Sequence, residues 1–305
     1  MTRFPGPLDL GTLDGPVLVY GGTYSNLQAT EALLAEADRL NIPPERRIHT
    51  GDVVAYCADA AAVTDLVMTS GGHVVRGNCE EGFGQDLDGC GCGFEEGSAC
   101  DLASRDWVAH ADRQLSPQHR AFMARCPGEI RFRLGGLSFA ATHGGFSAVN
   151  RFVFAPDEDA IAEELSLTDV DCVLAGHCGV PFHHRQNGRH WINAGVVGMP
   201  FNDGTPETGF VVLSPETDAV RVTFHRLSYD QYGASAAMRH HGLPAGYADA
   251  LLSGLWPNMD VMPPAQQALC GQPLELPPML IHPPQFQDRS SALMQAESRY
   301  PQHIV

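Results

Sequence analysis

The sequence has little positive charge, no long hydrophobic run and no internal repeat. Its 305 residues carry 19 Lys and Arg against 36 Asp and Glu, a formal net charge of −17. A surface this acidic repels a phosphate backbone, so we expect no extended nucleic-acid binding, and a small anionic substrate needs a local metal or arginine patch. Residues 1–14 contain no apolar run of the signal-peptide type, and no stretch reaches the length of a membrane span. These absences predict a cytoplasmic protein with no membrane association.

The cysteines also exclude one class of protein. Nine is an odd number, and a chain of this length can bury a core without covalent cross-links. A secreted disulfide framework therefore explains them poorly. The sequence predicts reduced thiols that are available to bind metal.

Strands and helices alternate in the first eighty residues. Apolar runs predict strands at 16–20, 47–50 and 73–76, and helical periodicity predicts helices at 26–40 and 60–68. Later strand candidates lie at 130–134, 137–141, 172–175, 191–193, 210–213 and 220–224, with one helix at 157–165. The pattern predicts an α/β layered fold whose second half is a mixed or antiparallel sheet.

Two segments interrupt this plan. Residues 81–102 are rich in glycine and acidic side chains, which predicts a long irregular loop that could act as a lid. From residue 227 a helix at 245–255 gives way to a proline-rich tail, a type of segment that wraps the surface or a partner subunit. We therefore expect a domain at 1–226, an extension at 227–305, and a homo-oligomer that could form through the tail.

Polar side chains follow four of the predicted strands directly. They are Asp52, Asn78, His143 and His177. Ligands gather at the carboxyl ends of strands in open α/β sheets, so these side chains should converge. One carboxylate, one amide oxygen and two imidazoles suit a divalent transition metal such as Mn, Fe or Zn.

The order and setting of these residues resemble the calcineurin-like metallophosphoesterases, in particular the small bacterial branch related to phosphodiesterases and diadenosine tetraphosphate hydrolases. The resemblance runs from about Val17 to Leu213 and rests on the segments Gly51–Tyr56, Gly77-Asn78, Thr142-His143-Gly144, Gly176-His177 and Asn193–Gly195. It implies a four-layer α/β-β/α sandwich, with two mixed β-sheets flanked by helices. It also implies two metals bridged by Asp52, the second of which is bound further by Asn78, His143 and His177.

The sequence departs from the family at the first metal. The family's motif of aspartate, any residue, histidine falls on Gly22 and Tyr24, and its last metal-binding histidine falls on Gly179. Two metals clamp the attacking and leaving oxygens of an in-line displacement. With only Asp52 and the phenol of Tyr24 left for the first ion, the resemblance predicts one strongly bound metal. One metal can still polarise a phosphoryl oxygen and lower the pKa of bound water, so hydrolysis stays open.

Several cysteines lie in the same loops as the candidate metal ligands. Cys79 stands where the family has the histidine that assists the leaving group, so we take Cys79, His143 and Asp52 as the catalytic candidates. Candidates for metal or redox ligands are Cys79 itself, Cys57 and Cys178 on the site loops, and Cys90, Cys92 and Cys100 in the insertion. Such thiols favour Zn, Fe or Cu(I). Alternatively, a free cysteine is a small buried apolar residue, the reading we accept for Cys126, Cys172 and Cys270.

A few other residues are weaker candidates. Arg76 and Arg151 could contact a substrate anion, although each could equally form a surface ion pair. Glu80 should orient its neighbours. His183, His184 and His190 could replace the histidine missing at Gly179, but a solvated hairpin explains them better.

Three functions remain open at this stage. The leading one is a metal-dependent phosphoesterase that acts on a small phosphorylated or nucleotide substrate through one strong metal. The second is a metalloenzyme with a thiolate-rich site and redox or thiol chemistry. The third is a non-catalytic binding or regulatory protein that kept the fold.

Overall fold

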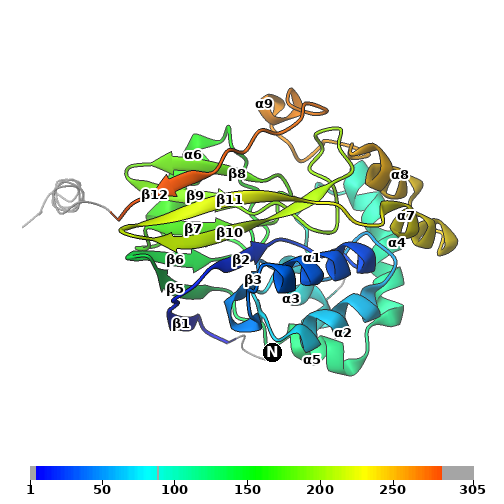
Figure 1. The fold of residues 1–305 in the computed structure, drawn as a ribbon. Helices are drawn as coiled ribbons and strands as arrows, with labels where there is room; N and C mark the ends of the chain where they lie inside the picture. Colours follow the sequence, from blue (N-terminus) through cyan, green and yellow to red (C-terminus); the bar gives the residue numbers. More distant parts are fainter. Residues whose placement is uncertain (1–4, 88, 284–305) are drawn as a thin grey trace, which may run out of the picture.

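Two six-stranded sheets pack face to face and carry helices on their outer faces (Figure 1). The computed structural model describes residues 5–87 and 89–283. Both sheets mix parallel and antiparallel strands. The first has the order β12-β11-β10-β2-β3-β4. Its strands are β2 (Val17–Tyr20), β3 (Arg47–His49), β4 (His73–Val74), β10 (Thr208–Glu216), β11 (Ala219–Leu227) and β12 (Met279–Ile281).

The second sheet has the order β1-β5-β6-β7-β9-β8. Its strands are β1 (Leu8–Thr12), β5 (Ile130–Leu134), β6 (Leu137–Ala141), β7 (Cys172–Ala175), β8 (Phe182–Gln186) and β9 (Arg189–Asn193). The helices are α1 (Leu27–Arg39), α2 (Ala60–Ser70), α3 (Asn78–Gly84), α4 (Ala99–Gln114), α5 (Pro117–Met123), α6 (Glu158–Ser166), α7 (Gln231–His240), α8 (Ala245–Ser253) and α9 (Pro264–Gln267), with a 3-10 turn at Pro44–Arg46.

Side chains that alternate along each strand face two different layers of the fold. In β2, Val17 and Val19 join the core between the two sheets, whereas Leu18 and Tyr20 pack against α1. This is the period of two that a strand imposes on its side chains. On the other outer face, Trp191 of β9 packs in the cluster that contains Ile161 of α6. The predicted four-layer sandwich is confirmed.

The insertion contains more structure than its composition predicted. We expected an irregular loop at 81–102, but α3 extends to Gly84 and α4 begins at Ala99. Ser98 caps α4 by accepting a hydrogen bond from the N–H of Asp101, and Trp107 buries the helix against the core. These caps and contacts outweigh the glycine content. The prediction of a loop is therefore wrong at both ends of the segment.

The chain after β11 packs onto the sandwich. In Figure 1, α7 and α8 lie beside α4, and their apolar residues share one buried cluster with Val63 of α2 and Trp107 of α4. β12 then adds an edge strand to the first sheet, with Ile281 opposite Val220. The predicted role of the last proline-rich residues, 284–305, lies outside the described residues. None of the described helices is long and apolar enough to cross a bilayer.

Candidate metal centre

Four polar side chains from both sheets meet at the ends of strands. Asp52 follows β3, Asn78 begins α3 just after β4, His143 follows β6 and His177 follows β7. All four are buried: their exposed fractions are 4%, 1%, 1% and 8%. Polar groups buried this deeply need partners, because desolvation without compensation is costly. Burying this cluster therefore lowers the stability of the folded chain.

The backbone around the cluster has no room for larger residues. Gly51 has φ +100°, and a Cβ on it would lie 2.8 Å from Nδ1 of His143. A Cβ on Gly77 would collide with the carboxylate of Asp52. Asp52 and His177 themselves adopt φ values of +65° and +54°. Strained backbone of this kind collects at functional sites, where the surrounding structure holds it in place.

One ring nitrogen lies at the centre of the cluster. His143 Nε2 is 3.0 Å from Asn78 Oδ1, 3.0 Å from His177 Nδ1 and 3.3 Å from Asp52 Oδ2. The atoms of Asp52, His143 and His177 that could bind metal all lie within 4.8 Å of one another. Ligands around a tetrahedral zinc with bonds of about 2.0–2.1 Å are separated by about 3.3 Å. The cluster has the size of a metal site.

Hydrogen bonds on the far side of each group aim its lone pairs at the centre. Nδ1 of His143 donates to the carbonyl of Thr50 at 2.7 Å, so Nε2 carries the lone pair in the neutral ring. Nδ2 of Asn78 donates to the carbonyl of Cys90 at 2.8 Å, which turns its Oδ1 inward. Oδ1 of Asp52 accepts from the N–H of Cys79 at 3.1 Å, so its Oδ2 faces the cluster. Acceptors that converge in this way fit a cation.

The charges of Asp52 and His177 favour the same occupant. Burial would raise the pKa of Asp52, but His143, His177 and the N–H of Cys79 lower it to about 2. Burial and the neighbouring His143 lower the pKa of His177 to about 3. At neutral pH Asp52 is therefore ionised and His177 is neutral. These are the protonation states in which both side chains bind metal. For His143, burial lowers the pKa but the Asp52 carboxylate raises it above its ordinary value, so a cation would have to displace a proton there.

Glu80 ties the two ligand loops together. Its carboxylate accepts hydrogen bonds from the backbone N–H groups of Asp52, Val53 and Gly77 at 2.7–2.8 Å. It is fully buried. Glu80 thus holds Asp52 and the start of α3 in register, the orienting role that the sequence suggested.

The comparisons with known proteins identify the family. A model of the calcineurin-like phosphoesterase superfamily domain matches residues 17–218. The chain belongs to this superfamily. Its members use divalent metals, and the cluster around His143 is the candidate site in this one. A search of curated proteins finds no match.

Two solved structures support the fold. A metallophosphoesterase from Sphaerobacter thermophilus is 24% identical, with a TM-score of 0.62, and the match covers 79% of this chain and 99% of that one. A hypothetical protein from Pyrococcus horikoshii OT3 has the same TM-score and coverage at 14% identity. At these identities the likeness is one of fold.

Aromatic rings fill the space beside Gly22 and Gly179, the two positions at which we expected first-metal ligands to be missing. A Cβ on Gly22 would collide with the ring of Tyr24, and a Cβ on Gly179 would lie 2.8 Å from the ring of Trp256. Trp256 is anchored by hydrogen bonds from its indole N–H to the carbonyl of Pro200 and from its backbone N–H to Asn202. Packing against these rings leaves no space for a larger side chain at either glycine.

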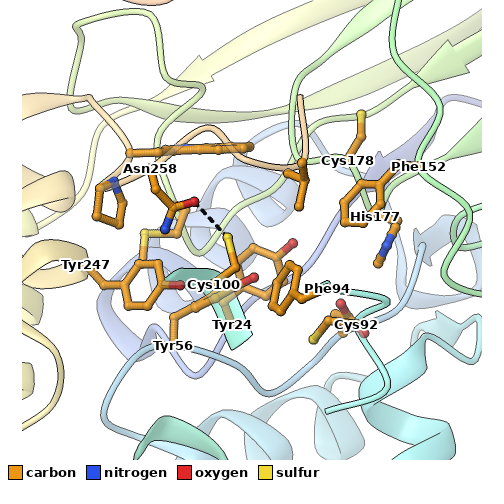
Figure 2. Close-up of a pocket in the computed structure, with 15 residues that line it drawn as sticks. Tyr24, Tyr56, Cys92, Phe94, Cys100, Phe152, His177, Cys178, Tyr247 and Asn258 are labelled. Carbon is orange, nitrogen blue, oxygen red and sulfur yellow. Dashed lines mark hydrogen bonds between the residues drawn. The ribbon is translucent and has the colours of Figure 1, made fainter. Parts of the chain in front are cut away.

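A cavity of about 70 Å³ adjoins the candidate metal centre on this side (Figure 2). Asp52 and His177 line one end of it. The rest of its lining includes six aromatic residues: Tyr24, Tyr56, Phe94, Phe152, Tyr247 and Trp256. In Figure 2 the three tyrosines lie on one side, Phe152 lies with His177 on the other, and Phe94 lies between them. Of these rings, sequence reasoning gave a candidate site role only to Tyr24. Tyr56 ends one of the segments that carry the family resemblance, and the other four lie in no motif.

The cysteines do not join the cluster of candidate ligands. Among the described His, Cys, Asp and Glu residues, that cluster comprises Asp52, His143 and His177. Cys90 and Cys92 are joined as a disulfide, so the expectation of reduced thiols is wrong for this pair. Cys92 Sγ still lies 3.4 Å from Nδ2 of Asn78.

Three of the remaining candidate thiols contact uncharged groups, and the fourth, Cys79, hydrogen-bonds the carboxylate of Asp52. Cys57 points at the carbonyl of Gly198, Cys178 at that of Val180, and Cys100 at Oδ1 of Asn258, 2.7 Å away. Cys79 is fully buried. Burial raises the pKa of each of these thiols, so they stay protonated at neutral pH.

The weaker candidates lie elsewhere. Arg76 lines a second, larger cavity of about 1010 Å³ on the side of Asn78, and its Nε is 3.4 Å from the carboxylate of Glu81. Arg151 pairs with Glu163. His183 and His190 lie on the β8–β9 hairpin and contact each other, with ring nitrogens 2.8 Å apart. His190 is buried, so the predicted hairpin is only partly solvated.

Proposed function

We propose that this protein is a metal-dependent phosphoesterase with one strongly held divalent transition metal, bound by Asp52, Asn78, His143 and His177. One observation carries the proposal: three lone-pair donors converge around a fourth, His143 Nε2, while rings fill the space beside Gly22 and Gly179. A complete second set of ligands is therefore missing from the described residues. The candidate metals are Mn, Fe and Zn, which accept mixed nitrogen and oxygen ligands.

Different residues of the protein would bind the metal, orient its ligands and contact the substrate. Asp52, Asn78, His143 and His177 would hold the metal, and Glu80 and the carbonyl of Thr50 would keep the ligands oriented. A bound metal supplies Lewis-acid chemistry, polarising a phosphoryl oxygen and lowering the pKa of a water molecule. Arg76, beside Asn78 in the larger cavity, is the candidate contact for the substrate anion. The aromatic cavity excludes bulk water from the side of Asp52.

Cys79 contributes its backbone in this scheme. Its N–H fixes Oδ1 of Asp52, whereas burial raises the pKa of its thiol and makes the thiol a poor proton donor. We therefore assign Cys79 a positioning role and expect the leaving group to take its proton from solvent. An enzyme without a general acid favours substrates whose leaving groups are weak bases.

Removal of the metal tests the proposal. Wild-type protein treated with a chelator and dialysed should lose turnover of aryl and alkyl phosphates, because no other Lewis acid is available. Adding Mn²⁺, Fe²⁺ or Zn²⁺ back should restore turnover in at least one case. A colorimetric assay of released phosphate measures both steps on phosphomonoesters. Chromatography of the monoester or nucleotide products measures them on phosphodiesters and dinucleotides.

The alternatives give different results in the same assay. A non-catalytic homologue would bind metal and ligands without turnover under any metal. A thiolate-rich redox site would show sulfur ligands in the metal-edge absorption spectrum of the loaded protein. Turnover that survives complete removal of metal would contradict the proposal.

A further inference from the structure

The aromatic cavity beside Asp52 is built from segments far apart in the sequence. Tyr24 and Tyr56 come from the loops after β2 and β3, Phe94 from the insertion, and Tyr247 and Trp256 from the chain beyond β11. Their rings contact one another: Tyr56 lies 4.9 Å from Tyr24 and 4.7 Å from Tyr247 between ring centroids. On the metal side, Phe152 lies 4.3 Å from the ring of His177. The cavity and the candidate metal centre are continuous.

The rings stand where the superfamily places ligands of the first metal. Tyr24 fills the space beside Gly22, and Trp256 fills the space beside Gly179. Trp256 comes from the segment after α8, which supplies a complete wall of the cavity with Pro257, Asn258 and Val261. Asn258 is held to the opposite wall by its contact with Cys100 (Figure 2). This half of the site has therefore been rebuilt around apolar groups.

The lining decides what the cavity can bind. None of the described residues that line it is an arginine, and its only ionic groups are at the metal end. A phosphate chain or a bare sugar would lose its hydration there without gaining charged partners. A flat apolar group would gain burial and edge-to-face contacts with the surrounding rings. The volume of about 70 Å³ limits that group to one small ring.

We propose that this cavity binds the organic group of the phosphoester substrate, a single aromatic or apolar ring, while the phosphoryl group lies at the metal. The proposal rests on the phosphoesterase function and names its substrate class. The ring could be an aryl group of the leaving alcohol or a nucleobase. Each source has a matched pair of probes.

Binding and turnover of matched probes test the proposal. Benzylphosphonate should bind to the Mn²⁺-loaded protein at least about 10-fold more tightly than methylphosphonate in calorimetry, because the two differ only in the buried ring. Benzyl and ethyl phosphate have alcohols of similar basicity, and the benzyl ester should have the higher kcat/KM. Uridine 5′-monophosphate against ribose 5-phosphate reports on a nucleobase with a single ring. Equal values within all three pairs would overturn the proposal.

A variant that fills the cavity locates the effect. Val261→Phe should reduce the preference for the benzyl probe several-fold, because its larger side chain takes up the volume. Leu255→Phe adds the same ring at an exposed position that does not line the cavity, and should leave the preference unchanged. Trp256→Ala, which enlarges the cavity, provides a second test if Val261→Phe does not fold. An unchanged preference in both cavity variants would contradict the assignment.

The outcomes separate this inference from the proposed function. Turnover of all phosphate esters without a ring preference removes the ring site and leaves the phosphoesterase. Loss of turnover for every ester in every metal removes the phosphoesterase, and the phosphonate affinities then still report on the cavity.

Discussion

Replacing His143 with alanine should lower kcat/KM for phosphoester hydrolysis by at least about 1000-fold. His143 Nε2 is the atom around which the other three candidate ligands converge, so its loss should abolish metal binding at physiological concentrations. A metal that stabilises the transition state by about 4 kcal/mol accounts for an effect of this size. Steady-state kinetics in excess Mn²⁺, with metal content measured on the same samples, would test the prediction.

His119→Ala is the matched control for that variant. His119 is also a buried histidine with a carboxylate partner, 2.9 Å from Asp65, but it lies at the start of α5. Its loss should leave the metal content and kcat/KM close to wild type. If His143→Ala kept both metal and turnover, the metal centre described above would be wrong.

Restoring the family's histidine at position 179 should fail to create a second metal site. Gly179 has φ +76°, and a Cβ there would lie 2.8 Å from the ring of Trp256. Gly179→His should therefore lower the free energy of unfolding by about 2–5 kcal/mol, from left-handed strain and overpacking together. Chemical denaturation measures this loss, and the metal content should stay at one ion per chain.

Gly188 provides an unusually close control. It has φ +78° and no atom within 4 Å of an added Cβ. Gly188→His should therefore lose only the backbone contribution, about 1–2 kcal/mol. Equal losses at the two positions would mean that Trp256 does not fill the ligand space. In a Trp256→Ala background, adding Gly179→His should cost only the backbone contribution, about 1–2 kcal/mol, because the ring that blocks the Cβ is gone.

The clustering of the candidate metal ligands could be predicted because each lies within four residues of the end of a strand. Asp52, Asn78, His143 and His177 stand in short motifs, and the topology of the sheets brings strand ends together. The layered fold could also be predicted, because strand and helix periodicity are local properties of the sequence. The roles of the individual residues stay predictions until variants are measured.

The aromatic cavity could not be predicted from the sequence. Tyr24 and Trp256 are more than 200 positions apart, and no spacing rule links a loop tyrosine to a tryptophan in a C-terminal segment. The loss of ligands at Gly22 and Gly179 was visible, but the rings that replaced them required the packing. The prediction of a loop at 81–102 was wrong for a similar reason. The glycines of this segment suggested a loop, whereas the cap at Ser98 and the burial of Trp107 stabilise α4.

The number of metal ions per chain tests the central claim most directly. Elemental analysis of protein purified without oxygen or added metal, and again after loading with excess Mn²⁺ and desalting, should give one ion per chain in wild type and none in His143→Ala. Cys79→Ser should match wild type, because no thiol joins the described cluster. Two ions per chain, or a loss of metal in Cys79→Ser, would contradict a single site of nitrogen and oxygen ligands.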